Sequence, residues 1–163
     1  MLAEQKLDSI ESTYHELTLI WRELCLLHTQ LFELTNNEYQ LLLTSETDQL
    51  EINLAEKKQV VQSINDYDLR RQTCIDKLGL GAANFALMNQ HLVKHLNLET
   101  PHQLEKYNDY LLDIIEKIQM QNIKNRQFLN RAMIMMEGLR KDFQNSGKVL
   151  SYNNKGNLQK HTR

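Results

Sequence analysis

Proline and glycine are scarce in this sequence, whose 163 residues include one proline and five glycines. Average proteins contain about 7% glycine and about 5% proline, so this chain has few residues that interrupt helices. It also lacks the apolar-polar alternation that marks strands, and it contains no internal repeat. We therefore predict an all-α protein: an elongated antiparallel helical bundle, or a coiled-coil hairpin of long helices, with one short helix.

Strong charge and long apolar runs are missing as well. The net charge is -2, whereas a general nucleic-acid binder usually has a strongly basic face. No apolar run reaches the length of about 18 residues that a membrane span requires. The opening segment, MLAEQKLDSIE, lacks the basic and apolar blocks of a secretion signal. We expect a cytoplasmic protein without nucleic-acid binding or membrane insertion, with Cys25 and Cys74 reduced and buried.

Catalytic motifs are also absent. The sequence has no glycine-flanked serine, no cysteine beside a basic cluster and no phosphate-binding glycine loop, so we predict no enzymatic activity and no cofactor. His91 and His95 are four residues apart and form a partial zinc pattern, but no glutamate lies between them. We interpret them as surface or capping histidines and predict no metal site, with a metal-binding bundle as the lesser alternative.

Apolar spacing predicts two long helices in the first half of the chain. The first is expected at about 7–43, and the second continues to Leu78, where Gly79 suits the left-handed residue that ends a helix. Between them, residues 44–48 (TSETD) fit either a turn with Ser45 as the N-cap or a continuous helix. The apolar stripe of the second helix is predicted to contain Leu50, Leu54, Val61, Ile64, Ile75 and Leu78.

A short helix and a long last helix are predicted for the second half. The short helix is expected at about 83–95, after which Thr100 and Pro101 suit the N-cap and first position of a helix that reaches about 145. The remainder, 146–163, loses helical periodicity and contains basic residues without an acidic one. We therefore predict a helical domain at 1–145 and a mobile basic tail at 146–163.

The last helix changes character along its length. A polar segment, NIKNRQ at 122–127, separates an early apolar stripe from a second half that contains Met133, Met135 and Met136. Methionine adapts to irregular or changing neighbours, so these residues either fill a gap in the chain's own core or contact another protein's helix. Apolar residues on several sides of the helix favour more than one neighbour. The late apolar stripe of this helix consists of Leu129, Met133, Met136, Leu139 and Phe143.

Several short motifs follow one another along the chain. None is specific alone, because leucine-rich helices with charged surfaces are common. After the leucine-rich first helix they are Glu56–Lys58 (EKK), the pair Arg70 and Arg71, the stop at Leu78 and Gly79, the N-x-x-N pattern of Asn122 and Asn125 with Phe128 and Leu129 behind it, and the stretch from Tyr152 to Gly156.

This ordered combination resembles the FlgN-type flagellar export chaperones. The resemblance implies a cytoplasmic helical protein without catalysis, which binds the helical terminal segments of hook-associated (hook–filament junction) proteins. It would prevent their premature assembly and deliver them to the flagellar type III export gate. The family's substrate-binding region corresponds to the apolar residues from Leu129 to Phe143, and the tyrosine linked to the gate corresponds to Tyr152. The chain departs from the family pattern at Asn153, where aspartate is usual, and at Arg126, where glycine is frequent.

One alternative of another class stays open. Long helices with apolar stripes also occur in structural or adaptor proteins that self-associate as coiled coils, here through the first helix. The chaperone hypothesis itself allows a homodimer. The concentration dependence of the sedimentation coefficient separates the two, because a scaffold forms large assemblies whereas a chaperone stays monomeric or dimeric.

Overall fold

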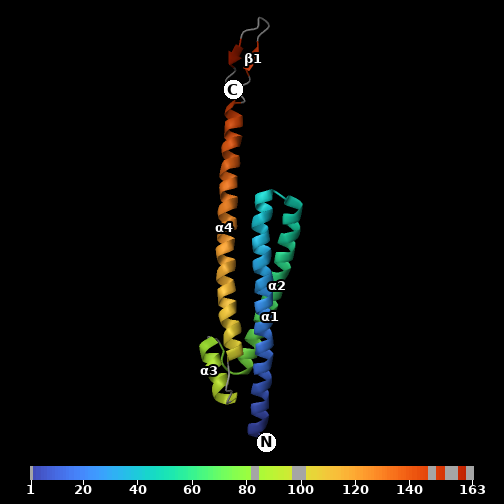
Figure 1. The fold of residues 1–163 in the computed structure, drawn as a ribbon, viewed down its shortest axis with the longest axis vertical. Helices are drawn as coiled ribbons and strands as arrows, with labels where there is room; N and C mark the ends of the chain where they lie inside the picture. The colour runs from blue at the N-terminus through green and yellow to red at the C-terminus, as the bar shows by residue number, and fades with distance from the viewer. Residues whose placement is uncertain (1, 82–84, 97–101, 147–149, 153–157, 161–163) are drawn as a thin grey trace. The chain divides into compact units, whose positions relative to one another are not determined.

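The computed structural model of the chain describes residues 2–81, 85–96, 102–146, 150–152 and 158–160. The described elements are helices α1 (Leu2–Thr44), α2 (Thr47–Lys77), α3 (Phe85–Leu96) and α4 (His102–Ser146), then strands β1 (Leu150–Tyr152) and β2 (Leu158–Lys160) (Figure 1). They confirm the predicted all-α bundle of long helices with one short one. None of these helices is both long and apolar enough to cross a membrane.

The chain divides into two compact units, Met1–Ile123 and Lys124–Arg163, and the division falls within α4. The first unit contains α1, α2, α3 and the first part of α4. The second contains the rest of α4 and the two strands. This division differs from the predicted boundary between a domain at 1–145 and a tail at 146–163, which stays a prediction.

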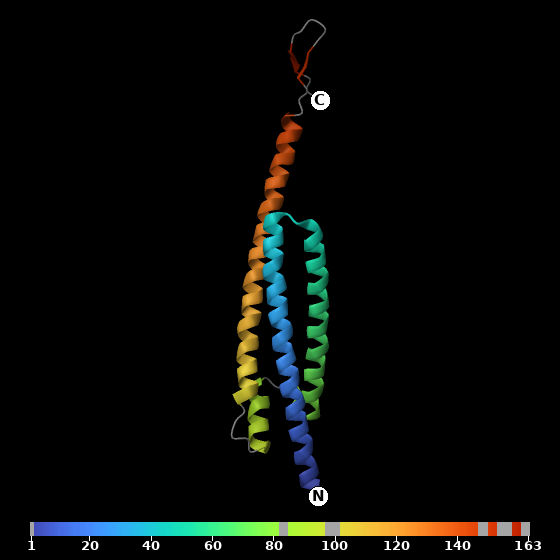
Figure 2. The same ribbon diagram turned by 45° about the vertical axis from the view of Figure 1, so that its right-hand side comes forward.

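Helices α1 and α2 form an antiparallel hairpin in the first unit (Figure 2). On α1, Ile10, Leu17 and Leu24 recur every seven residues and are buried. A seven-residue repeat keeps one face of a long helix against its neighbour, and burying a leucine or isoleucine contributes about 1.5–3 kcal/mol. The hydrophobic core is therefore concentrated along α1, together with residues of the other helices: Cys74, Ile75, Met88, Leu92 and Leu104.

The predicted stripe of α2 was partly wrong. Leu54 and Val61 are 44% and 40% exposed, whereas their neighbours Asn53 and Val60 are buried. Asn53, Val60 and Cys74 lie on one seven-residue repeat, the spacing that two long antiparallel helices maintain. The buried apolar residues near the end of α2 determine which face of the helix is turned toward the core. Following the repeat back from them, Asn53 lies on the buried face and Leu54 lies at its edge. The positions of the apolar residues alone could not predict which face of α2 is buried.

The segment at 44–48 is a turn, because α1 ends at Thr44 and α2 begins at Thr47. Ser45 was expected to cap α2, but it has a positive φ of 58° and ends α1 instead. The Glu46 N–H donates to the Leu41 carbonyl across 3.1 Å, which is the hydrogen bond of a Schellman motif. The end of α2 has the same arrangement, with Gly79 at φ 71° and the Leu80 N–H donating to the Ile75 carbonyl. The predicted role of Gly79 is thus confirmed.

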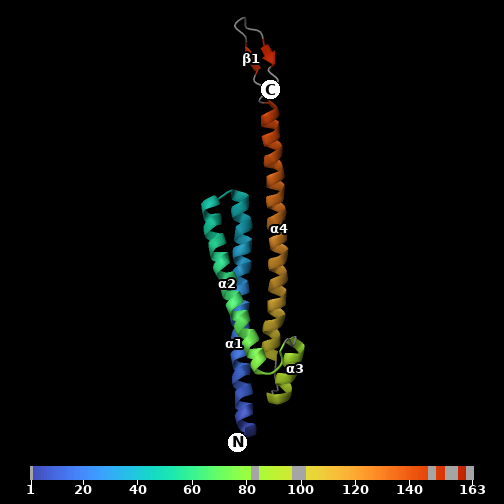
Figure 3. The ribbon, with the colours of Figure 1, turned by 180° about the vertical axis from the view of Figure 1, so that it is seen from behind.

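Helix α3 lies beside the first turns of α4 (Figure 3). The Asn89 side-chain amide donates to the Glu105 carboxylate across 2.7 Å, and the Phe85 ring contacts the Trp21 ring of α1 at a centroid distance of 5.8 Å. Two further bonds join α1 to α4: the Cys25 thiol donates to the Tyr107 carbonyl, and the Thr29 hydroxyl bonds the Tyr110 hydroxyl. The predicted N-cap and first position of α4, Thr100 and Pro101, lie outside the described residues.

Strands β1 and β2 were not predicted. They pair in antiparallel register, with Leu150 opposite Lys160 and Tyr152 opposite Leu158. Three residues are too few to show the alternation that identifies a strand from sequence. The sequence between the strands contains three asparagines and a glycine, residue types that favour turns. This two-stranded element is the one exception to the helical fold among the described residues.

Candidate partner-binding face of helix α4

One face of α4 changes its surroundings along the helix. Residues eighteen positions apart are separated by about five whole turns, so their side chains leave the helix in the same direction. Ile118 is 7% exposed, whereas Met136 on the same face is 62% exposed. Asn125 and Phe143 are likewise eighteen apart, and their exposures are 3% and 75%. The face that is buried in the first half of α4 is therefore exposed in the second.

The predicted binding residues all lie on or beside this exposed face. Leu129, Leu139 and Phe143 are exposed, and so are Met133 and Met136. Their spacing of three, four and seven residues places them along one side of the helix. The methionines therefore do not fill a gap in the chain's own core, which was the other interpretation of the sequence. We call these five residues the exposed stripe: Leu129, Met133, Met136, Leu139 and Phe143.

The apolar surface is wider than the stripe. Ile134 and Met135 are about 70% exposed as well. A shallow hollow of about 610 Å³ lies over Met133, Ile134 and Met136, and its other lining residues are Asn130, Glu137 and Arg140. Arg140 was not among the predicted residues. Its position was nevertheless visible in the sequence, because it follows Leu129 by eleven residues, or about three turns.

The polar segment at 122–127 marks the position where exposure changes. The Asn122 side-chain oxygen accepts a hydrogen bond of 3.1 Å from the Lys57 ammonium of α2. The same ammonium pairs with the Glu38 carboxylate of α1 at 2.6 Å, and both side chains are largely buried. Three helices of the first unit thus share one polar contact. Asn122 is therefore part of a polar contact between helices, at the position where the buried stretch of α4 meets the exposed stretch.

Tyr152 is separated in sequence from the exposed stripe and is the last residue of β1. Its backbone pairs with Leu158 of β2. The placement of its side chain lies outside the described residues. The structure therefore positions only the backbone of Tyr152, in an antiparallel strand pair.

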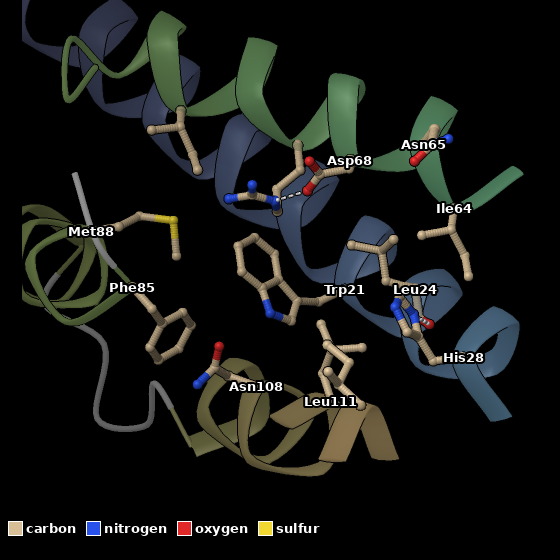
Figure 4. Close-up of a pocket in the computed structure, with 13 residues that line it drawn as sticks. Trp21, Leu24, His28, Ile64, Asn65, Asp68, Phe85, Met88, Asn108 and Leu111 are labelled. Atoms are coloured by element: carbon tan, nitrogen blue, oxygen red, sulfur yellow. Dashed lines mark hydrogen bonds and ion pairs between the residues drawn. The ribbon is translucent and has the colours of Figure 1, made fainter. Parts of the chain in front are cut away.

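A second concave site lies among the helices of the first unit. A cavity of about 340 Å³ is bordered by Trp21, Phe85, Asp68 and Asn108, which come from four different helices (Figure 4). Its titratable groups already have partners: Asp68 binds Arg71 at 2.7 Å, and a ring nitrogen of His28 lies 2.7 Å from the Leu24 carbonyl. These contacts leave the cavity with the character of a packing gap rather than a site for a charged ligand.

Metal binding finds no support in the described part of the chain. No group of three or more His, Cys, Asp or Glu side chains is positioned to hold a metal ion there. Of the predicted pair His91 and His95, the side chain of His95 lies outside that part. Cys25 and Cys74 are free and buried, as predicted.

Comparison with protein families decides the identity of the chain. A family model described as FlgN protein matches residues 5–160, nearly the whole sequence. The chain belongs to the FlgN family. FlgN proteins are chaperones of flagellum biogenesis, and this gives the chain its general role. Comparisons with curated proteins and with solved structures gave no match.

The FlgN match includes the exposed stripe and both strands, because residues 129–143, 150–152 and 158–160 lie inside the matched range. It also includes the polar segment at 122–127. The exposed apolar stretch of α4 has the chemistry of a protein-contact surface.

Proposed function

We propose that this FlgN-family chain binds the helical terminal segments of hook-associated proteins through the exposed stripe of α4. It acts in the cytoplasm, prevents premature assembly of these clients and delivers them to the flagellar export gate. The observation that carries the proposal is the pair Ile118 and Met136, which share one helix face and differ from 7% to 62% in exposure.

The energy available at the stripe is sufficient for a specific contact. Covering a Leu, Met or Phe side chain completely contributes about 1.5–3 kcal/mol. The five side chains of the stripe are each between two-fifths and three-quarters exposed, so covering them contributes on the order of 5 kcal/mol before the cost of association. The client's own apolar side chains are covered in the same contact and contribute a similar amount, which offsets the cost of association and leaves a contact that can be released at the gate.

The composition of the stripe also suits a chaperone. Methionine side chains have several rotatable bonds and a polarisable sulfur, so they adapt to client helices that differ in shape. Met133 and Met136 lie at the centre of the stripe, with Leu129 before them and Phe143 after them. An amphipathic client helix can lie along this surface with its own apolar residues at three- and four-residue spacing.

The test is the affinity for the terminal helical segment of a hook-associated protein from the same organism, measured by calorimetry. We expect Met136→Glu, Met133→Glu and Phe143→Glu each to weaken binding at least tenfold, because each places a charge in an apolar contact. Met120→Glu is the matched control. Met120 is a similarly exposed methionine of α4, but it precedes Met136 by sixteen residues and so lies on the opposite side of the helix.

Comparing these variants shows whether the client binds to the exposed stripe. Circular dichroism should show unchanged helix content in all of them, since the substituted positions are exposed. If Met120→Glu weakens client binding as much as Met136→Glu, the contact does not involve one face of α4. If none of the variants weakens it, the client binds elsewhere.

We assign gate docking to Tyr152, on the basis of its place in the family pattern. Tyr152→Ala should leave the client affinity unchanged and reduce export of the client in cells. Normal export by this variant would remove Tyr152 from the proposal without affecting the stripe. The two assignments are therefore tested independently.

Self-association through the first helix is the weaker proposal. The apolar residues of α1, including Leu17, Trp21 and Leu24, are buried within the first unit. A scaffold would need those residues on its surface. Sedimentation over a range of concentrations should therefore show no large assemblies.

A further inference from the structure

The second half of α4 is basic, although the whole chain is not. Residues 124–144 contain five basic and two acidic side chains, whereas the chain as a whole has a net charge of -2. The exposed stripe therefore lies in a positive environment. This observation is independent of the apolar character on which the proposed function depends.

Two of the basic residues flank the stripe on one edge. Arg126, Met133 and Arg140 recur every seven residues, so they lie in one row beside Leu129 and Met136. Both arginines are exposed, and Arg140 lines the hollow over Met133 and Met136. Fourteen residues separate the arginines, which corresponds to about 21 Å along the helix.

Neither arginine is neutralised in the part of the chain that the structure describes. Glu137 is close to Arg140 in sequence, but its carboxylate pairs with the Lys141 ammonium at 3.2 Å. The other ion pairs there involve neither Arg126 nor Arg140. Both guanidinium groups can therefore bind carboxylates of another molecule, and arginine does so with two parallel hydrogen bonds.

A second copy of this chain does not supply those carboxylates. In an antiparallel helix pair, the row of Arg126, Met133 and Arg140 meets the same row of the other copy, which places arginine against arginine. In a parallel helix pair, the same row meets the opposite edge of the stripe in the other copy. Arg140 of one copy then faces Met135 of the other. The charge pattern thus disfavours a homodimer through this stripe.

We infer that the stripe selects amphipathic helices whose apolar face is flanked by carboxylates. Arg126 and Arg140 bind these carboxylates at two points about four turns apart, and the two points set the register of the client along α4. The inference rests on the proposed function for the existence of a client helix. It adds the charge by which that helix is distinguished from others of equal hydrophobicity.

The experiment uses three designed helices of about 25 residues, long enough to be helical in water when built from strong helix formers. They share one leucine stripe and carry Glu, Gln or Lys at every position flanking it, so either orientation presents the same charge. Dissociation constants for the full chain are measured by fluorescence anisotropy. We expect the Glu helix to bind about fivefold more tightly than the Gln helix, and the Lys helix to bind most weakly.

Variants assign the preference to the two arginines. Arg126→Gln with Arg140→Gln should reduce the preference for the Glu helix over the Gln helix to within about twofold. Arg126→Glu with Arg140→Glu should invert it in favour of the Lys helix. Lys124→Gln with Arg131→Gln is the matched control: it makes the same change in net charge away from the stripe, and it should preserve the preference.

Several results would overturn the inference. They are equal affinity of wild type for the three helices, no binding of any of them, and an equal loss of preference in the control variant. Self-association of the chain that Met136→Glu abolishes would also overturn it. If Met136→Glu weakens binding of the hook-associated segment while the designed helices bind equally, the proposed function stands and this inference fails. If that segment binds independently of Met136, the proposed function itself fails.

Discussion

The two stretches of α4, residues 102–123 and 124–144, have the same apolar periodicity and opposite surroundings. In the first, Leu104, Ile114 and Ile118 are buried; in the second, the continuation of that face is exposed from Leu129 onward. The balance of charge also reverses, from four acidic and two basic residues to two acidic and five basic. The spacing of apolar residues therefore indicates which face of a helix packs against another surface. The exposure and the charge of that face indicate whether the other surface belongs to the same chain or to a partner.

The strongest test of this comparison substitutes equivalent positions in the two stretches. Ile118→Glu should lower the free energy of unfolding by about 3–5 kcal/mol, because it buries a charge among helices. Met136→Glu, on the same face eighteen residues later, should change it by less than about 0.5 kcal/mol. Urea unfolding followed by the fluorescence of Trp21, the single tryptophan, measures both. A large loss for Met136→Glu would show that the stripe is covered within the folded chain.

The next prediction concerns the contact where the buried stretch ends. Lys57 is paired with Glu38 and also donates to Asn122, and the Lys57 and Glu38 side chains are 17% and 13% exposed. Lys57→Met should lower the free energy of unfolding by about 2 kcal/mol, because it leaves a largely buried carboxylate without its partner. Lys57→Met with Glu38→Leu should recover most of that loss in the same urea experiment. No recovery would mean that packing, rather than the lone charge, determines the effect.

The buried stretch of α4 was predictable from sequence, and so were the helices that cover it. Leu104, Ile114 and Ile118 form a regular stripe, and burial of such a stripe is what makes a long helix stable in water. The stripe residues of the second stretch were equally predictable as apolar. Their exposure was not, because a sequence pattern is the same whether a helix is covered by its own chain or by another.

Other features depend on relations that a local pattern does not contain. Asn53 is buried because the seven-residue repeat of α2 is aligned by residues as distant as Cys74 and Ile75. Its side-chain amide has no hydrogen-bond partner among the described protein atoms. A prediction from hydrophobicity alone therefore places this polar residue at the surface. Ser45 was expected to start a helix and instead ends one, since both roles suit a short polar residue and the hydrogen bond to Leu41 decides between them.

A prediction for alkaline solution tests how α1 holds the buried stretch. The Cys25 thiol donates to the Tyr107 carbonyl of α4, and burial raises the pKa of this thiol from 9.0 to about 11. The folded protein therefore keeps a proton that the unfolded chain loses first. The stabilising contribution is complete below about pH 9 and is lost as the pH rises toward 11. Unfolding free energies measured across this range should decline less steeply for Cys25→Ala than for wild type; parallel declines would contradict the assignment.

The smallest effect is expected in the turn between α1 and α2. Ser45 adopts a φ of 58°, which glycine adopts without steric cost and serine does not. Ser45→Gly should raise the free energy of unfolding by up to about 1 kcal/mol, whereas Thr47→Gly, inside the first turn of α2, should lower it by a similar amount. Neither variant should change the affinity for the client helix, since the stripe is on another element. If the client affinity changed together with these small changes in stability, binding would depend on the hairpin of α1 and α2. The contrast between the two stretches of α4 would then not be sufficient to explain where the client binds.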